Sequence, residues 1–78
     1  MTINGMLFEY EGEMKHNDAH GYGIARCGAV SFEGTFFNDA PEGICRYVQV
    51  DGDIYDGEWK QGKKRGKMTK TIYKTKIN

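Results

Sequence analysis

The sequence predicts an all-β fold in which roughly six strands form an antiparallel meander. One short frame, aromatic–acid–Gly–x–large apolar, begins at Tyr10, Phe32 and Tyr55, so the chain is built from repeats spaced by 22 and 23 residues. Apolar and polar residues alternate around each frame, which is the pattern of a half-buried strand. No segment keeps a helical period over a useful length, and the connections are short, so consecutive strands are expected to pair as neighbours.

The lead-in and the first repeat are expected to supply three strands. The Asn4-Gly5 pair is typical of a two-residue hairpin turn, so we expect residues 1–3 to pair as a short strand with residues 8–15. Within 8–15 the apolar and glycine positions alternate with acidic positions. Turn-forming residues predict a loop at 16–21, and the chain is expected to return as a strand at 22–27.

The second and third repeats follow the same plan. We expect strands at residues 30–37, 44–50, 53–60 and 67–73, loops at 38–43 and 61–66, a tight turn at Asp51-Gly52 and fraying at 74–78. Pro41 lacks a backbone N–H, so it is expected in a loop and not in a central strand. Each repeat therefore forms one hairpin, over about residues 8–29, 30–52 and 53–73.

Two sets of glycines recur with the frame. Gly12, Gly34 and Gly57 fall in mid-strand, where a missing side chain leaves a slot for an aromatic ring from a neighbouring strand. The second set, expected to end the loops with positive φ angles, is Gly21, Gly43 and Gly66. The leading aromatic residues of the three frames would then stack along the sheet.

Size and cysteine content indicate one small domain, residues 1–78. A chain of this length buries only about 60% of the surface that its unfolded form exposes, so its stability is marginal. Cys27 and Cys45 lie 18 residues apart in no metal-binding pattern, and we expect reduced thiols in a cytosolic protein, with a disulfide between them as the alternative. No secretory signal and no apolar run long enough to span a membrane is present in the sequence.

Charge is strongly segregated along the chain although the formal net charge is zero. Residues 1–58 hold all eleven acidic residues and three basic ones, a net charge of −8. Residues 59–78 hold eight basic residues and no acidic one, a net charge of +8. Segregation of this kind bears on association and not on fold.

No group of residues forms a convincing catalytic or metal-binding pattern. His16, Asp18 and His20 are close in sequence, but they fall in a predicted loop where this spacing does not bring ligands together. Ser31 is the only serine and falls on the predicted solvent face of a strand. We therefore expect no enzyme, no metal, no cofactor and no small-molecule substrate.

The repeats resemble those of the MORN family (membrane occupation and recognition nexus), whose pattern is roughly Y-x-G-x-W/F followed by H-G-x-G. The matching segments are Tyr10-x-Gly12-x-Met14 with His20-Gly21-Tyr22-Gly23, Phe32-x-Gly34-x-Phe36 with Glu42-Gly43-Ile44-Cys45, and Tyr55-x-Gly57-x-Trp59 with Arg65-Gly66-Lys67-Met68. Asp51-Gly52 matches the turn between repeats, and the resemblance covers about residues 8–70. The departures at Met14, Cys45 and Met68 affect the regularity of packing.

The resemblance implies a single-layer, twisted, elongated sheet without catalytic activity. Members of the family bind proteins, associate with membranes or self-associate. We therefore expect a scaffold or interaction module that binds a protein partner, as a small subunit of a larger assembly, in the cytoplasm, on the cytoskeleton or at a membrane. A one-layer sheet leaves an apolar stripe for such a partner, and the residues expected to form it are Tyr10, Phe32, Phe36, Tyr55 and Trp59.

The basic third repeat supports an alternative, peripheral attachment to a membrane containing phosphoinositide or phosphatidylserine. Each basic residue near such a surface contributes about 1 kcal/mol, and the residues expected to do so are Lys63, Lys64, Arg65, Lys67 and Lys70. Nucleic acid is a weaker candidate, since only Trp59 and Tyr73 flank the charge. Self-association of the acidic first repeats with the basic last repeat is a further hypothesis.

Overall fold

The computed structural model describes residues 1–72, and all of its regular structure in that range is β-strand. The strands are β1 (Thr2–Ile3), β2 (Met6–Leu7), β3 (Glu9–Lys15), β4 (Asp18–Cys27), β5 (Val30–Phe37), β6 (Ala40–Val48), β7 (Ile54–Lys60) and β8 (Lys63–Thr71). Residues 1–72 contain no helix that is long and apolar enough to cross a membrane. The fraying expected at residues 74–78, and residue 73 of the last predicted strand, lie outside the described range.

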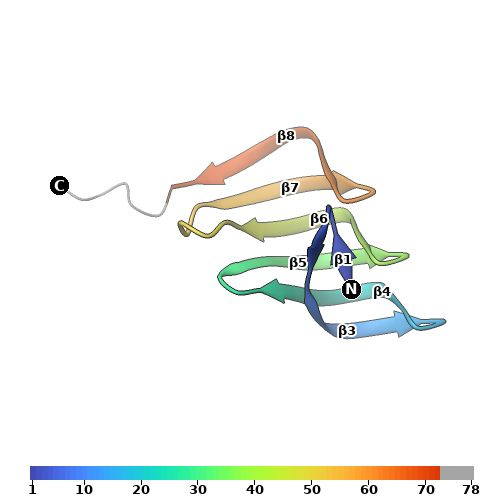
Figure 1. Ribbon diagram of the computed structural model, residues 1–78. Helices are drawn as coiled ribbons and strands as arrows, with labels where there is room; N and C mark the ends of the chain where they lie inside the picture. The colour runs from blue at the N-terminus through green and yellow to red at the C-terminus, as the bar shows by residue number, and fades with distance from the viewer. Residues whose placement is uncertain (73–78) are drawn as a thin grey trace.

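Strands β3 to β8 form one open, single-layer sheet in which every strand pairs antiparallel with its neighbours in sequence. Figure 1 shows them stacked in chain order, with β3 at one end and β8 at the other. Each repeat contributes one hairpin, β3–β4, β5–β6 or β7–β8. The predicted all-β, six-strand meander is confirmed.

The N-terminal residues form a separate hairpin. Of the predicted pairing between residues 1–3 and 8–15 only the contact of Met1 with Phe8 is present, where the Met1 amino group donates to the Phe8 carbonyl at 2.8 Å and the Phe8 N–H donates to the Met1 carbonyl at 2.6 Å, and the rest is wrong. Strand β1 pairs with β2, with Thr2 opposite Leu7 and Ile3 opposite Met6. The two-residue turn at Asn4-Gly5 has positive φ at both positions, so Ile3, just before the turn, pairs with Met6, just after it. Figure 1 shows this hairpin lying across one face of the large sheet.

The turns inside the repeats contain two residues and are shorter than predicted. They are His16-Asn17, Asn38-Asp39 and Gln61-Gly62, and both residues of each have positive φ. This conformation suits the right-handed twist of paired strands and favours Asn, Asp and Gly. The remaining residues of the predicted loops belong to β4, β6 and β8. Their backbone N–H and C=O groups are paired in the sheet, which favours a strand over a loop.

A β-bulge in each hairpin explains the second set of glycines. The register shifts after Gly12 in repeat one, Gly34 in repeat two and Gly57 in repeat three. The glycines expected to end loops lie within strands at these bulges, and their positive φ angles are confirmed for Gly21, Gly43 and Gly66. Bulges tolerate proline as well, so Pro41 lies buried inside β6 and not in the predicted loop.

The core lies between one face of the sheet and the N-terminal hairpin. Residues paired across antiparallel strands share a face, and the register aligns Tyr10, Ala25, Phe32, Tyr47, Tyr55 and Lys70 in one row. We call the side of the sheet that carries this row the aromatic face. Two core residues pack onto the aromatic face from outside the sheet, namely Ile3 in β1 and Phe8, which lies between β2 and β3.

The slots predicted at Gly12, Gly34 and Gly57 are not filled by aromatic rings. At Gly12 the nearest atoms to an added Cβ are the Gly23 Cα and the Tyr22 carbonyl oxygen, and the Tyr10 ring lies instead over Gly23, a glycine for which no slot was predicted. The nearest atoms to a Cβ on Gly34 are instead the Ile44 carbonyl oxygen and the Cys45 Cα. At Gly57 the neighbour is the Met68 side chain. Close backbone approach, and not ring stacking, therefore requires glycine at Gly34.

Hydrogen bonds from turns to neighbouring strands connect consecutive repeats. The Ala19 N–H donates to Asp39 Oδ1 at 2.6 Å, and the Asp39 N–H donates to the Ala19 carbonyl at 3.1 Å. The next repeat repeats this contact, since the Gly62 N–H donates to the Pro41 carbonyl at 3.0 Å. The Asn4 amide also donates to the Gly62 carbonyl at 3.0 Å, which ties the N-terminal hairpin to the third repeat.

Replacing Asp39 with glycine tests the contribution of this carboxylate. Glycine accepts the φ of 67° at this position, so the variant removes the acceptor for Ala19 N–H without adding backbone strain. We expect a loss of about 1–2 kcal/mol in the free energy of unfolding, measured by urea denaturation. Asn17→Gly changes the equivalent turn of repeat one and should be neutral or stabilising. Equal behaviour of the two variants would contradict the bridging role.

Candidate functional site

Phe32 lies at the centre of the aromatic face. It is 4% exposed, and its ring centroid lies 4.6 Å from that of Tyr47, 5.1 Å from that of Trp59 and 5.8 Å from that of Phe8. The Tyr47 ring in turn lies 6.2 Å from the Tyr55 ring. Phe32 therefore contacts the third repeat directly through Trp59, and it contacts Tyr55 by way of Tyr47, a residue of the return strand β6.

Trp59 packs against both Phe32 and Tyr47 in this cluster. Its ring meets Phe32 edge-on and lies 5.7 Å from Tyr47, and its indole Nε1–H donates to the Cys45 carbonyl at 3.2 Å. Edge-to-face geometry is favourable for aromatic pairs, and the hydrogen bond satisfies the polar end of the buried ring. Trp59 is thus fixed both by packing and by a hydrogen bond.

Tyr10 and Phe36 form a second aromatic contact towards the β3 edge. Their ring centroids lie 5.2 Å apart in an edge-on arrangement, and the Tyr10 hydroxyl donates to the Glu13 carbonyl at 2.7 Å. Partial burial, followed by the nearby Glu13 and Asp39 charges, raises the pKa of the Tyr10 phenol. Phe36 is buried whereas Tyr10 is half-buried, so only Tyr10 of this pair presents much surface to solvent.

Tyr55 is half-buried and carries two lysine side chains. Lys64 Nζ lies 4.3 Å and Lys70 Nζ 5.2 Å from the ring centroid, which are cation–π distances. Lys70 Nζ also lies 3.8 Å from Asp53 Oδ2. Hydrogen bonding to the Tyr55 side chain is the leading cause of the raised pKa of Lys70. The aromatic face therefore becomes cationic towards β8.

A groove runs between the N-terminal hairpin and the third repeat. It has a volume of about 460 Å³. Its lining includes Phe32, Tyr47 and Trp59 from the sheet, Ile3 and Met6 from the N-terminal hairpin, and Lys63 and Lys64 from β8. The hairpin thus covers part of the aromatic face, and the groove lies along the hairpin next to the buried Phe32 and Trp59 rings.

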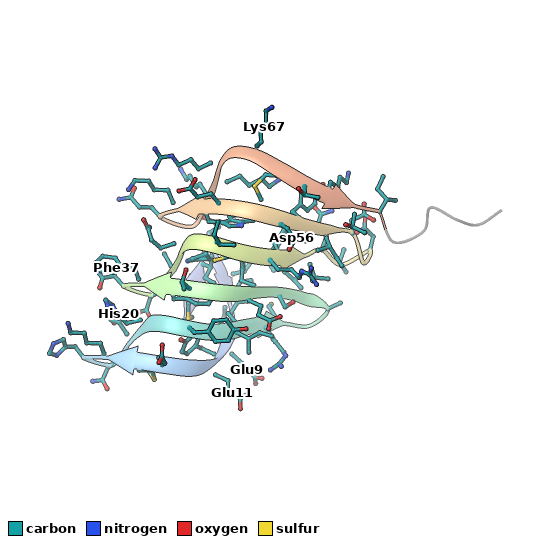
Figure 2. The ribbon with its side chains drawn as sticks, turned by 180° about the vertical axis from the view of Figure 1, so that it is seen from behind. Glu9, Glu11, His20, Phe37, Asp56 and Lys67 are labelled. Carbon is teal, nitrogen blue, oxygen red and sulfur yellow. The ribbon has the colours of Figure 1, made fainter. Side chains whose placement is uncertain are left out.

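The five predicted lipid-binding residues all lie in the edge strand β8 and not in a loop. Register places Lys64 opposite Trp59 and Lys70 opposite Tyr55, on the aromatic face, whereas Lys63 and Arg65 pair with Lys60 and Glu58 on the other face. Lys67 lies at the bulge, and Figure 2 shows it projecting away from the outer edge of the sheet. The structure therefore distributes this basic group around an edge and does not gather it on one plane.

The face opposite the aromatic face carries paired charges. The guanidinium of Arg46 donates two hydrogen bonds to Asp56, at 2.8 and 3.2 Å, and Arg26 lies 3.7 Å from Glu11. The Tyr22 hydroxyl donates to Glu33 at 2.9 Å. Figure 2 views the molecule from this side, with Asp56 over the middle of the sheet and Glu11 near its β3 end. These exposed pairs contribute little to stability and give this side a polar surface.

Cys45 is buried and is not an activated nucleophile. Both cysteines are free thiols. Burial raises the pKa of the Cys45 thiol, which keeps it protonated, and Sγ donates to the Thr35 carbonyl at 3.2 Å. A thiol is nucleophilic as its thiolate, so Cys45 is a packing residue. Over residues 1–72 no group of three or more His, Cys, Asp or Glu residues is placed to hold a metal ion.

The five residues predicted to bind a partner share one face, and Phe32 and Trp59 line the groove. They do not form the open stripe that was expected, because Phe32, Phe36 and Trp59 are buried and only Tyr10 and Tyr55 are half-buried. Tyr47 was missed, although its alternation with Cys45 in the same strand predicts its face. Ile3, Met6 and Phe8 were missed because no local pattern tells where the N-terminal hairpin packs.

An open sheet of three equivalent hairpins, with a row of aromatic side chains on one face, defines a β-repeat protein that is elongated by adding hairpins. Comparison with protein-family sequence models matches the MORN repeat at residues 10–28, 32–54 and 55–67. The chain therefore belongs to the MORN-repeat family, whose repeats are non-catalytic modules for interaction with proteins or membranes. Comparison with curated protein sequences finds no match.

Proposed function

We propose that this chain is a MORN-repeat interaction module that binds a protein partner in the groove beside Trp59. The observation that carries the proposal is the apolar groove with Lys64 beside it on the same face. Shape and apolar lining favour insertion of a large apolar side chain. The ammonium group of Lys64 favours an acidic residue next to that apolar side chain. The proposed partner is therefore a protein segment with an apolar anchor flanked by Asp or Glu.

Selection of random peptides displayed on phage, with the full chain immobilised, tests this proposal. Enriched peptides should share one large apolar residue with neighbouring acids. Met6 lines the groove at 45% exposure, so Met6→Asp places a carboxylate at the binding site with little effect on the core. We expect this variant to bind the enriched peptides at least about tenfold more weakly, as measured by isothermal titration calorimetry.

Ile44→Asp is the matched control. Ile44 is 72% exposed and lies on the face opposite the groove, opposite Glu58 in the register. Its replacement introduces the same carboxylate and should leave peptide binding unchanged. The proposal would be overturned if the peptides bound the Ile44→Asp variant more weakly and the Met6→Asp variant as tightly as the unchanged chain. That result would place the binding site on the face opposite the aromatic face.

Attachment to anionic membranes is the second candidate and has less geometric support. The basic residues of β8 lie on both faces of an edge strand, and Lys64 and Lys70 already contact Tyr55. Sedimentation with phosphatidylserine or phosphoinositide vesicles at physiological salt tests this candidate. Vesicle binding that is abolished by Lys63→Glu with Lys64→Glu would favour the membrane candidate, because it would show that these basic residues bind anionic lipid.

A further inference from the structure

The two edges of the sheet carry opposite charge. Strand β3 has three acidic residues and one basic residue, and β8 has five basic residues and no acidic one. Within residues 1–72 no strand pairs with the outer side of either edge. Figure 2 shows Glu9 and Glu11 at the β3 end of the sheet and Lys67 projecting from the β8 end. Edge strands leave unpaired backbone N–H and C=O groups that can bind another strand.

This charge arrangement discriminates between the ways in which two copies could meet. Lysine on an edge normally prevents pairing, and contact of β8 with a second β8 would place cations against cations. Contact of β3 with a second β3 would likewise bring acids together. Only β8 against β3 of another copy joins unlike charges. Because neighbouring strands alternate in direction through the sheet, that contact is antiparallel, like every contact inside the chain.

The internal junctions predict the register of such a contact. Between repeats one and two Tyr22 lies opposite Thr35, and between repeats two and three Ile44 lies opposite Glu58. The equivalent position at a third junction places Lys67 opposite Glu13 of the next copy. At a second position of the internal junctions, Ala25 lies opposite Phe32 and Tyr47 lies opposite Tyr55. The equivalent pair at the third junction is Lys70 opposite Tyr10 of the next copy.

One pair at the turn end of this register is unfavourable. His20 stacks on Phe37 at 4.9 Å between centroids, and Glu42 lies 3.7 Å from Lys60, at the two internal junctions. The equivalent residues at the third junction are Arg65 and Lys15 of the next copy, which repel each other. The predicted contact is therefore favourable in its centre and weakened at one end, as suits a reversible association.

We propose that copies of this chain associate head to tail, with β8 of one copy pairing with β3 of the next so that the repeat array continues across the junction. The groove lining includes Lys63 and Lys64 at the start of β8, whereas the contact pairs proposed at Lys67 and Lys70 lie outside that lining, so the contact does not depend on the proposed partner. A head-to-tail contact uses two different surfaces of each copy, so each new copy leaves one free edge and the assembly can grow.

Sedimentation velocity of the whole chain over a range of concentrations and ionic strengths tests the proposal. We expect species larger than a monomer at about 0.01 M salt, where the Debye length is about 30 Å, and their loss at about 1 M salt, where it is about 3 Å. Lys67→Glu should weaken association about fivefold to tenfold, and Lys15→Glu should strengthen it by a similar factor. Lys60→Glu makes the same charge change on the inner strand β7 and should have a smaller effect than either.

Mixing two variants tests whether the contact joins unlike edges. Lys67→Glu and Glu13→Lys each place like charges at the predicted pair, whereas an equimolar mixture offers only unlike pairs when the two variants alternate. Association should therefore fall in each variant alone and return in the mixture. Glu13 Oε1 accepts from the Tyr22 N–H at 2.7 Å, so thermal unfolding must first show that Glu13→Lys is folded. If it is not, the opposite effects of Lys67→Glu and Lys15→Glu decide the question.

A chain that stays monomeric at low salt and high concentration would overturn the proposal. So would equal effects of Lys67→Glu, Lys15→Glu and Lys60→Glu, which would indicate a general response to net charge. Met6→Asp should leave association unchanged, because Met6 lies on neither edge. Failure of the edge contact therefore leaves the peptide-binding test of the groove unaffected.

Discussion

Replacing Trp59 with alanine is expected to lower the free energy of unfolding by about 3–5 kcal/mol. The ring is 4% exposed, contacts Phe32 and Tyr47, and donates its indole N–H to the Cys45 carbonyl. Its removal leaves a cavity under the N-terminal hairpin and takes one hydrogen-bond donor from the Cys45 carbonyl. Since the total stability of a small domain is only about 5 kcal/mol at the low end, this variant should be largely unfolded at physiological temperature.

Urea denaturation followed by circular dichroism measures this loss. Ile44→Ala is the matched control, since Ile44 is exposed on the opposite face and its truncation should change stability by less than about 0.5 kcal/mol. Trp59→Phe should fall between the two, because it retains most of the apolar volume and loses the hydrogen bond. A Trp59→Ala chain as stable as the control would show that the aromatic cluster is not the core.

Gly34→Ala is expected to lower the free energy of unfolding by about 2–3 kcal/mol, the upper part of the range for overpacking. A Cβ on Gly34 would lie 2.5 Å from the Ile44 carbonyl oxygen and 2.7 Å from the Cys45 Cα. Both are backbone atoms of the paired strand β6, so relief requires the strands to separate at the centre of the sheet. No rotation of a side chain can make the space.

The control for this substitution is Gly28→Ala. Gly28 also has positive φ, at 60°, but a Cβ there has no neighbour within 4 Å. The difference between the two variants combines the close approach of β5 and β6 with the backbone cost of placing alanine at the Gly34 φ of 152°. Thermal unfolding should give a clearly lower midpoint for Gly34→Ala. Equal midpoints would show that the strands can adjust without cost.

Local patterns in the sequence were sufficient to predict the meander. The period-2 alternation and the repeated frame both involve residues near one another in sequence, so they can be recognised without knowledge of the fold. Together they predict that Tyr10, Phe32 and Tyr55 lie on one face, as the register shows. Turn lengths were less predictable. Asp18 and Ala40 follow turn-forming residues and could belong to a loop or a strand, and the β-ladder, a non-local feature, decides in favour of the strand.

The groove could not be predicted, because its second wall depends on where the N-terminal hairpin packs. Asn4-Gly5 predicts a turn, but nothing nearby in the sequence indicates that the Asn4 side chain binds the Gly62 carbonyl, 58 positions away. The basic residues were predicted as one group for a similar reason. Their division between the two faces follows from the pairing of Lys64 with Trp59 and of Arg65 with Glu58, two adjacent pairs on the same side of the bulge.

Mapping of a bound peptide by nuclear magnetic resonance tests the central claim, that the groove is the interaction site, most directly. The full isotope-labelled chain would be titrated with an enriched peptide that carries an apolar anchor and acidic residues. We predict that the largest shift changes fall on the Trp59 indole N–H and on the backbone of Met6 and Lys64, all of which line the groove. Changes centred on Tyr22 and Ile44, with the Trp59 signal unmoved, would contradict the account.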